Sequence, residues 1–202
     1  MDILDLNKDY WDNRYKNMEI GWDIGYASPA IIKYAETVIP KDASILIPGC
    51  GNAHEAKALL EKGFENITLL DIAPTLVDQV QKAFGVIPQL QIICQDFFQH
   101  EQQYDYILEQ TFFCALDPAL RENYSSKIAS LLQPRGILAG LLFDREFPVQ
   151  GPPFGGNKPE YQHLFLSSFD ILKMETCFNS IPQRQGSELF IELRQKQFIF
   201  RA

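Results

Sequence analysis

Two short segments of the sequence place side chains where they could bind a nucleoside. An apolar run at residues 45–47 leads into a turn that contains Gly49 and Gly51, and a second apolar run at residues 67–70 ends in Asp71, twenty residues after Gly51. A glycine turn lets backbone N–H groups approach a ligand closely at the start of a helix. An acid at the tip of the next strand can accept hydrogen bonds from ribose hydroxyls. We therefore predict a nucleoside cofactor.

The third position of the glycine motif indicates which nucleoside. A dinucleotide fingerprint has Gly or Ala three residues after its second glycine, where this chain has His54. This departure favours S-adenosylmethionine, which has no pyrophosphate to pack against the helix, over NAD. A nicotinamide-dependent oxidoreductase is the alternative, but it would require a hydride-acceptor site, and none is recognisable in 202 residues.

The composition limits the class of protein. A chain of 202 residues suits a single domain, residues 1–202, with a sizeable core. Its 18 basic and 26 acidic residues give a net charge of −8 without a basic cluster, so we expect no nucleic-acid partner. No signal peptide or membrane span is recognisable, and four widely spaced cysteines suit reduced thiols of a cytoplasmic protein. The three histidines lack metal-ligand spacing, so no metal is expected.

Strand and helix signals alternate along the chain, which is typical of an α/β fold with helices on both faces of a mostly parallel sheet. The expected strands are residues 44–47, 67–70, 90–94, 104–109 and 136–143, followed by an antiparallel pair at residues 169–178 and 189–200. The expected helices are one capped by Asn52 and Glu55 and ended by Gly63, one at residues 74–84, and one from Asp117 to near Pro134. The Gly- and Pro-rich residues 148–159 suit a rim or lid loop. This order predicts a seven-stranded sheet.

The segment before the first strand is rich in aromatic residues. It contains both tryptophans of the chain and several of its tyrosines: Tyr10, Trp11, Tyr15, Trp22, Tyr26 and Tyr34. Because no linker or repeat separates residues 1–40 from the rest, we expect them to fold onto the sheet as an N-terminal arm or lid. Trp11 and Trp22 could pin this arm to the core, or they could form the wall of a ligand site.

Several motifs, in order along the chain, resemble the thiopurine S-methyltransferase family, and within it the halide and thiol methyltransferases. They are Y-W-D-N-R-Y at residues 10–15, G-W-D-I-G-Y-A-S-P-A at 21–30, I-P-G-C-G at 47–51, L-D-I at 70–72, D-F-F at 96–98, T-F-F-C-A-L-D-P at 111–118 with Arg121, and G-P-P-F at 151–154. The resemblance implies a Rossmann-like class I methyltransferase fold, S-adenosylmethionine as cofactor, and a soft anion or thiol as methyl acceptor.

The resemblance also implies a role for individual residues. The cofactor set is Trp11, Tyr15 and Trp22 around the cofactor, Gly49 under its methionine part, Asp71 and Ile72 at the ribose, Asp96 and Phe97 beside the adenine, and Gln110. Gln110 and Arg121 are expected near the reacting end as the catalytic candidates. Many family members have tryptophan in place of Tyr15, and an aspartate–tyrosine pair in place of Glu109 and Gln110. From the residues alone, Asp71 could instead cap the helix that starts at Pro74, and Arg121 could form an ion pair with Glu122 or Glu109.

The chemistry expected of this set is methyl transfer to a small-molecule acceptor: a thiol, hydrosulfide, thiocyanate, halide or thiopurine. Such a nucleophile is an anion, or nearly so, at neutral pH, so a dry pocket helps and no dedicated general base is required. Phe112, Phe113 and Phe143, with the loop at residues 152–154, are expected to form the walls of a narrow acceptor site. The protein is expected to be a monomer or weak homo-oligomer. A non-catalytic sensor that binds S-adenosylmethionine is the alternative to which the Glu109–Gln110 departure points.

Overall fold

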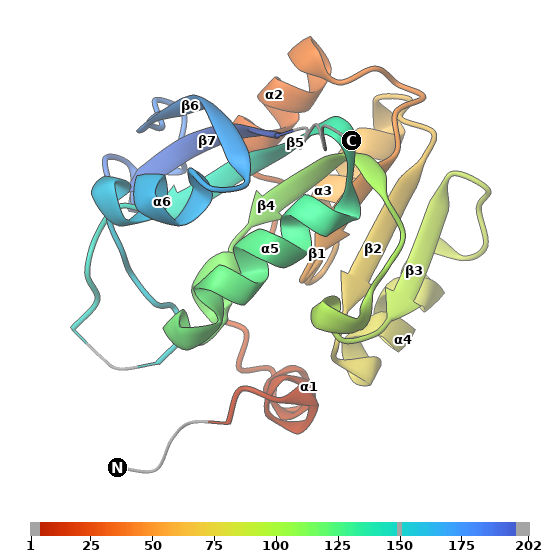
Figure 1. Cartoon of the computed structure of the whole chain (residues 1–202). Helices are drawn as coiled ribbons and strands as arrows, with labels where there is room; N and C mark the ends of the chain where they lie inside the picture. Colours follow the sequence, from red (N-terminus) through yellow and green to blue (C-terminus); the bar gives the residue numbers. More distant parts are fainter. Residues whose placement is uncertain (1–4, 149–150, 197–202) are drawn as a thin grey trace.

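Seven strands form one mixed sheet in the computed structural model, which describes residues 5–148 and 151–196 (Figure 1). The strands are β1 (Ile45–Pro48), β2 (Ile67–Asp71), β3 (Leu90–Cys94), β4 (Tyr104–Gln110), β5 (Leu132–Phe143), β6 (Phe169–Thr176) and β7 (Glu188–Gln195). Their order across the sheet is β3-β2-β1-β4-β5-β7-β6, and only β7 runs antiparallel to its neighbours β5 and β6. The predicted seven-stranded sheet with an antiparallel end is confirmed. Residues 197–200 of the last predicted strand lie outside the described residues.

Helices cover both faces of this sheet. They are α1 (Lys8–Lys16), α2 (Pro29–Val38), α3 (His54–Glu61), α4 (Pro74–Phe84), α5 (Arg121–Leu131) and α6 (Lys158–Phe165). In Figure 1, α5 and α6 lie in front of the sheet and α2, α3 and α4 behind it. Because successive strand residues point to opposite faces, Ile45 and Ile47 of β1 pack in the core under α2, α3 and α4, whereas Leu46 packs in the core under α5 and α6. No described helix has the length and hydrophobicity that a bilayer span requires.

Two local predictions were wrong. Asn52 and Glu55 do not form a capping box, because Ala53 is the N-cap of α3, in the left-handed conformation and without a side-chain hydrogen bond. The buried Glu55 carboxylate instead accepts a hydrogen bond from the Ser28 backbone N–H, 2.9 Å away, and so ties the arm to α3. Residues 148–159 are also not all loop, since α6 begins at Lys158, with Asn157 as its N-cap.

The strand order places the ends of β1, β2 and β4 beside one another. The chain leaves β1 toward β2 on one side, and β4 pairs with β1 on the other. The crevice at the carboxyl ends of strands where the order reverses is where open α/β sheets bind ligands. In this fold the glycine turn, Asp71 and Gln110 all lie at that edge, because they follow β1 and end β2 and β4. Figure 1 shows α1 below the ends of these strands.

Candidate active site

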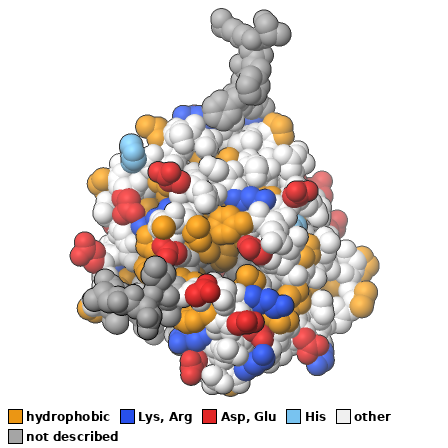
Figure 2. All heavy atoms as spheres, turned by 60° about the horizontal axis from the view of Figure 1, so that its bottom comes forward, with side chains coloured by type: hydrophobic (Ala, Val, Ile, Leu, Met, Phe, Trp, Pro, Cys, Tyr) orange, Lys and Arg blue, Asp and Glu red, His pale blue; other side chains and the backbone are white. Residues whose placement is uncertain are grey.

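A cavity of about 700 Å³ opens at this edge of the sheet, a size typical of small-molecule sites. Figure 2 shows this end of the molecule: hydrophobic side chains gather in its middle and are bordered by both acidic and basic ones. All of the cofactor candidates predicted from the sequence line the cavity, namely Trp11, Tyr15, Trp22, Gly49, Asp71, Ile72, Asp96, Phe97 and Gln110. The structure therefore brings together residues from the arm and from the ends of four strands.

The glycine turn after β1 forms the base of the cavity. Gly49 and Gly51 both have positive φ angles, +58° and +52°, a conformation that costs other residues more than glycine. At Gly49 a side chain is also excluded sterically, because a Cβ atom there would lie 2.4 Å from Cδ2 of Phe112. The Gly51 N–H donates a weak hydrogen bond of 3.4 Å to Asp71 Oδ2. This turn thus joins the base of the cavity to both the end of β2 and the segment after β4.

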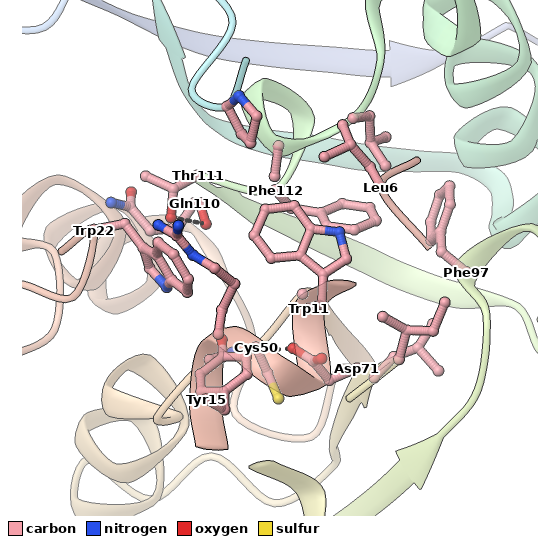
Figure 3. Close-up of a pocket in the computed structure, with 18 of the residues that line it drawn as sticks. Leu6, Trp11, Tyr15, Trp22, Cys50, Asp71, Phe97, Gln110, Thr111 and Phe112 are labelled. Atoms are coloured by element: carbon pink, nitrogen blue, oxygen red, sulfur yellow. Dashed lines mark hydrogen bonds between the residues drawn. The ribbon is translucent and has the colours of Figure 1, made fainter. Parts of the chain in front are cut away.

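Asp71 ends β2 with a buried carboxylate. Its Oδ1 accepts a hydrogen bond from Ala73 N–H at 3.0 Å, so the side chain shapes the turn before α4, but Ala73 itself is the N-cap of that helix. Burial raises the pKa of Asp71 to about 6, against the lowering effect of the backbone N–H donors of Ala73 and Gly51. Figure 3 shows the carboxylate near Cys50, on the cavity side of the strand end.

The arm closes the cavity with three aromatic rings. Trp22 makes edge-to-face contacts with Trp11 and Tyr15, with ring centroids 5.6 and 5.8 Å apart. The arm is fixed to the sheet side through Asp12 on α1, whose Oδ1 accepts a hydrogen bond of 2.7 Å from the Thr75 backbone N–H at the start of α4. Both roles considered for these rings in the sequence analysis are therefore compatible, because the rings pack against the core and also line the cavity.

A polar cluster holds the loop after α1 against α3. Asp23 accepts a hydrogen bond from the Gly25 N–H at 2.7 Å and from the Asn52 side chain, and its Oδ1 lies 2.9 Å from His54 Nε2. His54, which occupies the place of the third glycine in a dinucleotide motif, thus contacts the arm through Asp23. The donors lower the pKa of Asp23 although burial opposes this.

The arm should respond to cofactor binding, because three of its aromatic rings line the cavity. We predict that amide hydrogen exchange across residues 8–26 slows when S-adenosylhomocysteine binds. Exchange measured by mass spectrometry on free and ligand-saturated protein checks this, with the core strand β5 as the internal control. Equally slow exchange in the two states would show that the arm is a fixed part of the core.

Asp96, Phe97 and Phe98 follow β3 and line one end of the cavity. Asp96 Oδ1 accepts a hydrogen bond from the Phe98 N–H at 2.9 Å and starts a short 3₁₀ turn. Phe97 is buried and packs against Phe112 with ring centroids 5.1 Å apart. In Figure 3 the rings of Phe97, Trp11 and Phe112 approach a common space. The turn gives a flat apolar wall of the kind that an adenine ring can pack against.

A buried carboxylate organises the segment after β4. Glu109 Oε1 accepts hydrogen bonds from the Phe112 and Phe113 N–H groups at 2.8 and 2.9 Å, and its Oε2 accepts one of 2.7 Å from the Tyr124 hydroxyl. Burial raises the pKa of Glu109 to about 7, against these three donors. The turn that it holds, with Thr111 at φ +60°, directs Gln110 and Phe112 into the cavity.

The raised pKa values of Asp71 and Glu109 predict a pH dependence of stability. Both values, about 6 and about 7, exceed the usual 3.8 and 4.5. Their contribution to stability is therefore fully present below the ordinary carboxyl pKa and is lost as the pH rises through 6 to 7. We predict that ligand-free protein loses more unfolding free energy between pH 5 and 8 than its Asp71→Asn variant does, as measured by urea denaturation. Parallel pH profiles would show that Asp71 ionises normally.

Arg121 does not lie where the sequence placed it. It is absent from the cavity lining, and its guanidinium instead binds Glu160 of α6 and donates a 2.6 Å hydrogen bond to the Gly155 carbonyl oxygen. It also lies over the ring of Phe113, with 4.9 Å from its guanidinium carbon to the centroid. The first turn of α5 faces α6 and the loop before it, so Arg121 joins these elements rather than approaching the reacting end. The partner is Glu160, not the Glu122 or Glu109 considered from the sequence.

The predicted acceptor wall also needs correction. Phe112 lines the cavity, but Phe113 is buried behind it against Tyr124 and Phe165, and Phe143 packs beside Phe147 and Arg184. Pro152 and Pro153 of the predicted rim loop do line the cavity. The remaining wall at this end comes from Thr111, Ala115 and Leu116 of the T-F-F-C-A-L-D-P motif and from Leu120, residues to which the sequence analysis assigned no role.

Comparison with known proteins identifies the family. The profile of the thiopurine S-methyltransferase family matches residues 6–189. The chain belongs to this family. "Probable thiol methyltransferase 2" of Arabidopsis thaliana is 28% identical over 184 residues, covering 88% of this chain and 81% of the relative. Thiocyanate methyltransferase 1 of the same plant is 26% identical with the same coverage, and the thiopurine S-methyltransferase of Vibrio atlanticus is 29% identical over 208 residues, 92% of this chain and 95% of the relative.

Solved structures agree on the fold. The 1,6-didemethyltoxoflavin-N1-methyltransferase of Burkholderia thailandensis, with bound S-adenosylhomocysteine, matches with a TM-score of 0.73 at 17% identity, covering 94% of this chain and 86% of that one. Magnesium protoporphyrin IX methyltransferase of Synechocystis matches with a TM-score of 0.70 at 15% identity over 94% and 97%. The predicted class I methyltransferase fold is thus confirmed. As a member of the thiopurine S-methyltransferase family, the chain is a methyltransferase that uses S-adenosylmethionine.

The cavity fits this cofactor by the chemistry of its lining. A buried carboxylate at the end of β2 suits ribose hydroxyls, and the apolar turn after β3 suits an adenine. The base beside Gly51 is open, since a Cβ atom there would contact only the Tyr15 hydroxyl oxygen, at 3.8 Å. The aromatic rings of the arm suit a sulfonium cation.

Proposed function

We propose that this protein transfers a methyl group from S-adenosylmethionine to a small soft nucleophile: a thiol, hydrosulfide, thiocyanate or halide. One observation carries the proposal. The cavity-lining residues that the segment after β4 and the rim loop contribute are apolar apart from Gln110 and Thr111, and none of those described is titratable. A nucleophile that needs deprotonation by the protein would require a base there, whereas a thiolate or halide does not.

The cofactor supplies an activated methyl group on a positively charged sulfur, and the residues of this chain bind and orient it. Asp71 is suited to accept hydrogen bonds from the ribose, and Phe97 to pack on the adenine. The faces of Trp11, Tyr15 and Trp22 attract a cation, each such contact being worth on the order of 0.5 to 2 kcal/mol. Together they fix the direction from which an acceptor can approach.

The acceptor end contributes mainly by excluding water. Phe112, Leu116 and Leu120 line it with apolar groups, and Pro152 and Pro153 cover it from the rim. In an in-line displacement between an anion and a cation, charge is consumed, so the loss of the nucleophile's hydration shell assists the reaction. Iodide and thiolates are weakly hydrated compared with smaller anions, and they lose least on entering such a pocket. The relatives named as thiol and thiocyanate methyltransferases support this class of acceptor.

A test of the proposal is the release of labelled volatile product. Protein is incubated with methyl-labelled S-adenosylmethionine and with iodide, thiocyanate or hydrosulfide in turn, and the headspace is analysed. We expect a methylated product from at least one of them, and none when the acceptor is omitted. Tight binding of S-adenosylhomocysteine without transfer to any of these acceptors or to a thiopurine would favour the non-catalytic sensor instead.

A further inference from the structure

The cavity contains a cationic group that the catalytic candidates did not include. Arg14 of α1 lines the cavity, in the motif Y-W-D-N-R-Y, and is half-buried. The other cation among the described lining residues is Lys8, which is exposed at the start of the helix. Arg121 is bound to Glu160, and of Arg14 and Lys8 it is Arg14 that is the less exposed.

Arg14 packs against aromatic rings, but one of its hydrogen-bond donors has no partner among the described residues. Its guanidinium carbon lies 5.4 Å from the centroid of a Trp22 ring and 6.0 Å from that of Tyr10, so the side chain rests on aromatic faces. Its ion-pair partner, Glu19, lies 3.3 Å from Nη1 and is itself half-exposed. The buried Nε of Arg14 has no hydrogen-bond partner among the described residues. A buried donor without a partner is unfavourable and calls for an explanation.

A second unpaired polar group lines the same cavity. The Oε1 atom of Gln110 is buried and has no partner in the described part of the chain. Gln110 and Trp22, on which Arg14 rests, lie on the same side of the cavity in Figure 3. Rotation of the amide by 180° exchanges Oε1 for the NH₂ group, and that group can donate from the same point. Arg14 and Gln110 both line the cavity, and an arginine and an amide can each donate N–H groups to an anion.

We propose that Arg14 and Gln110 form an anion-binding subsite inside the cavity, on the side of Trp22. The acids that line the cavity already accept hydrogen bonds within the protein: Asp23, Glu55, Asp71 and Asp96. Glu19 pairs with Nη1 of Arg14 at 3.3 Å, and the buried Nε is left for a ligand. This inference rests on the proposed function, under which two anionic groups enter the cavity: the carboxylate of the cofactor's methionine part and an anionic acceptor. Either gives the charge-assisted hydrogen bonds that a guanidinium favours.

The experiment uses Arg14→Met, which keeps an apolar stem against Trp22 but removes the charge, and Arg14→Lys, which keeps the charge but not the planar fork. Arg194→Gln is the control, because Arg194 pairs with a half-exposed Asp170 on the outer strands and its loss changes the net charge equally. Calorimetry gives the affinities for S-adenosylhomocysteine and for 5′-methylthioadenosine, which lacks the amino-acid part.

Iodide binding is measured without turnover, through fluorescence quenching of the protein saturated with S-adenosylhomocysteine. Both tryptophans of the chain, Trp11 and Trp22, line the cavity, so iodide in the subsite should quench them saturably. Acrylamide, an uncharged quencher, reports exposure alone.

Two results support the subsite and separate its ligands. If the ligand is the cofactor carboxylate, Arg14→Met lowers the affinity for S-adenosylhomocysteine at least tenfold and the affinity for 5′-methylthioadenosine less than twofold. If the ligand is the acceptor, the same variant raises the dissociation constant of iodide at least tenfold and leaves the affinity for S-adenosylhomocysteine unchanged. Arg14→Lys should retain part of the effect, and it replaces Arg14→Met if that variant does not fold.

The proposal is overturned if all three affinities stay within twofold of wild type in the Arg14 variants, or if Arg194→Gln changes them equally. Failure of the proposed function looks different, because wild-type protein would then bind S-adenosylhomocysteine but methylate none of the acceptors.

Discussion

Replacement of Asp71 with alanine is expected to weaken the binding of S-adenosylhomocysteine by roughly tenfold or more, since each charge-assisted hydrogen bond from a ribose hydroxyl is worth about 1.5 to 3 kcal/mol. The fold should survive. The carboxylate is buried with a raised pKa, so its removal also removes a desolvation cost, which offsets the loss of the hydrogen bonds to Ala73 and Gly51. Titration calorimetry at pH 8 measures the affinity, and thermal unfolding measures the stability.

Asp78→Ala is the matched control for Asp71→Ala. Asp78 lies on α4 and pairs with Lys82 at the surface, so the control removes the same charge outside the cavity and should leave the affinity within twofold of wild type. If Asp71 only shapes the turn before α4, the pattern reverses: stability falls by about 1 kcal/mol and the affinity for S-adenosylhomocysteine does not change.

The second large effect is expected at Glu109, which the sequence singled out only as a departure from the family pattern. Glu109→Ala leaves the N–H groups of Phe112 and Phe113 and the hydroxyl of Tyr124 without their buried acceptor. Each unsatisfied donor costs about 1 to 3 kcal/mol, less the relief from removing a buried charge, so we expect a loss of roughly 3 kcal/mol in unfolding free energy. Affinity for S-adenosylhomocysteine should fall as well, because the same turn directs Gln110 and Phe112 into the cavity.

Urea denaturation at pH 8 measures the effect of Glu109→Ala. Glu101→Ala is the control, because Glu101 is exposed in the loop before β4 and its replacement should change stability by about 0.5 kcal/mol or less. A loss at Glu109 no larger than at Glu101 would show that the turn after β4 holds its shape without the carboxylate.

Much of the fold could be predicted from the sequence because its signals are local. Period-two and period-3.6 patterns, with Pro74 at a helix start and Gly63 after a helix end, fix most strands and helices. The glycine turn and Asp71 could be recognised as parts of one site, because the ends of adjacent parallel strands meet at one edge. Trp11 and Trp22 line the cavity, and it was the family resemblance rather than periodicity that suggested a cofactor role for them.

The errors arose where the outcome depends on packing between distant segments. Arg121 follows shortly after cavity-lining residues in the sequence. Its side chain, however, binds Glu160 of α6 and the Gly155 carbonyl of the loop before α6, and these distant partners set its direction. The spacing of Asn52 and Glu55 predicts a local cap, whereas the hydrogen-bond partner of Glu55 is Ser28, 27 residues away. Arg14 belongs to the motif Y-W-D-N-R-Y, in which only the aromatic residues suggested a binding role. That Arg14 lines the cavity follows only from the way α1 packs in the structure.

The central claim, that a small soft nucleophile is the methyl acceptor, is tested most directly by kcat/KM for iodide, hydrosulfide and a thiopurine on one preparation. The segment after β4 and the rim loop contribute mainly apolar residues and no titratable side chain to the described cavity lining, which predicts that iodide or hydrosulfide has the highest value. A thiopurine value tenfold above both anions would contradict the account.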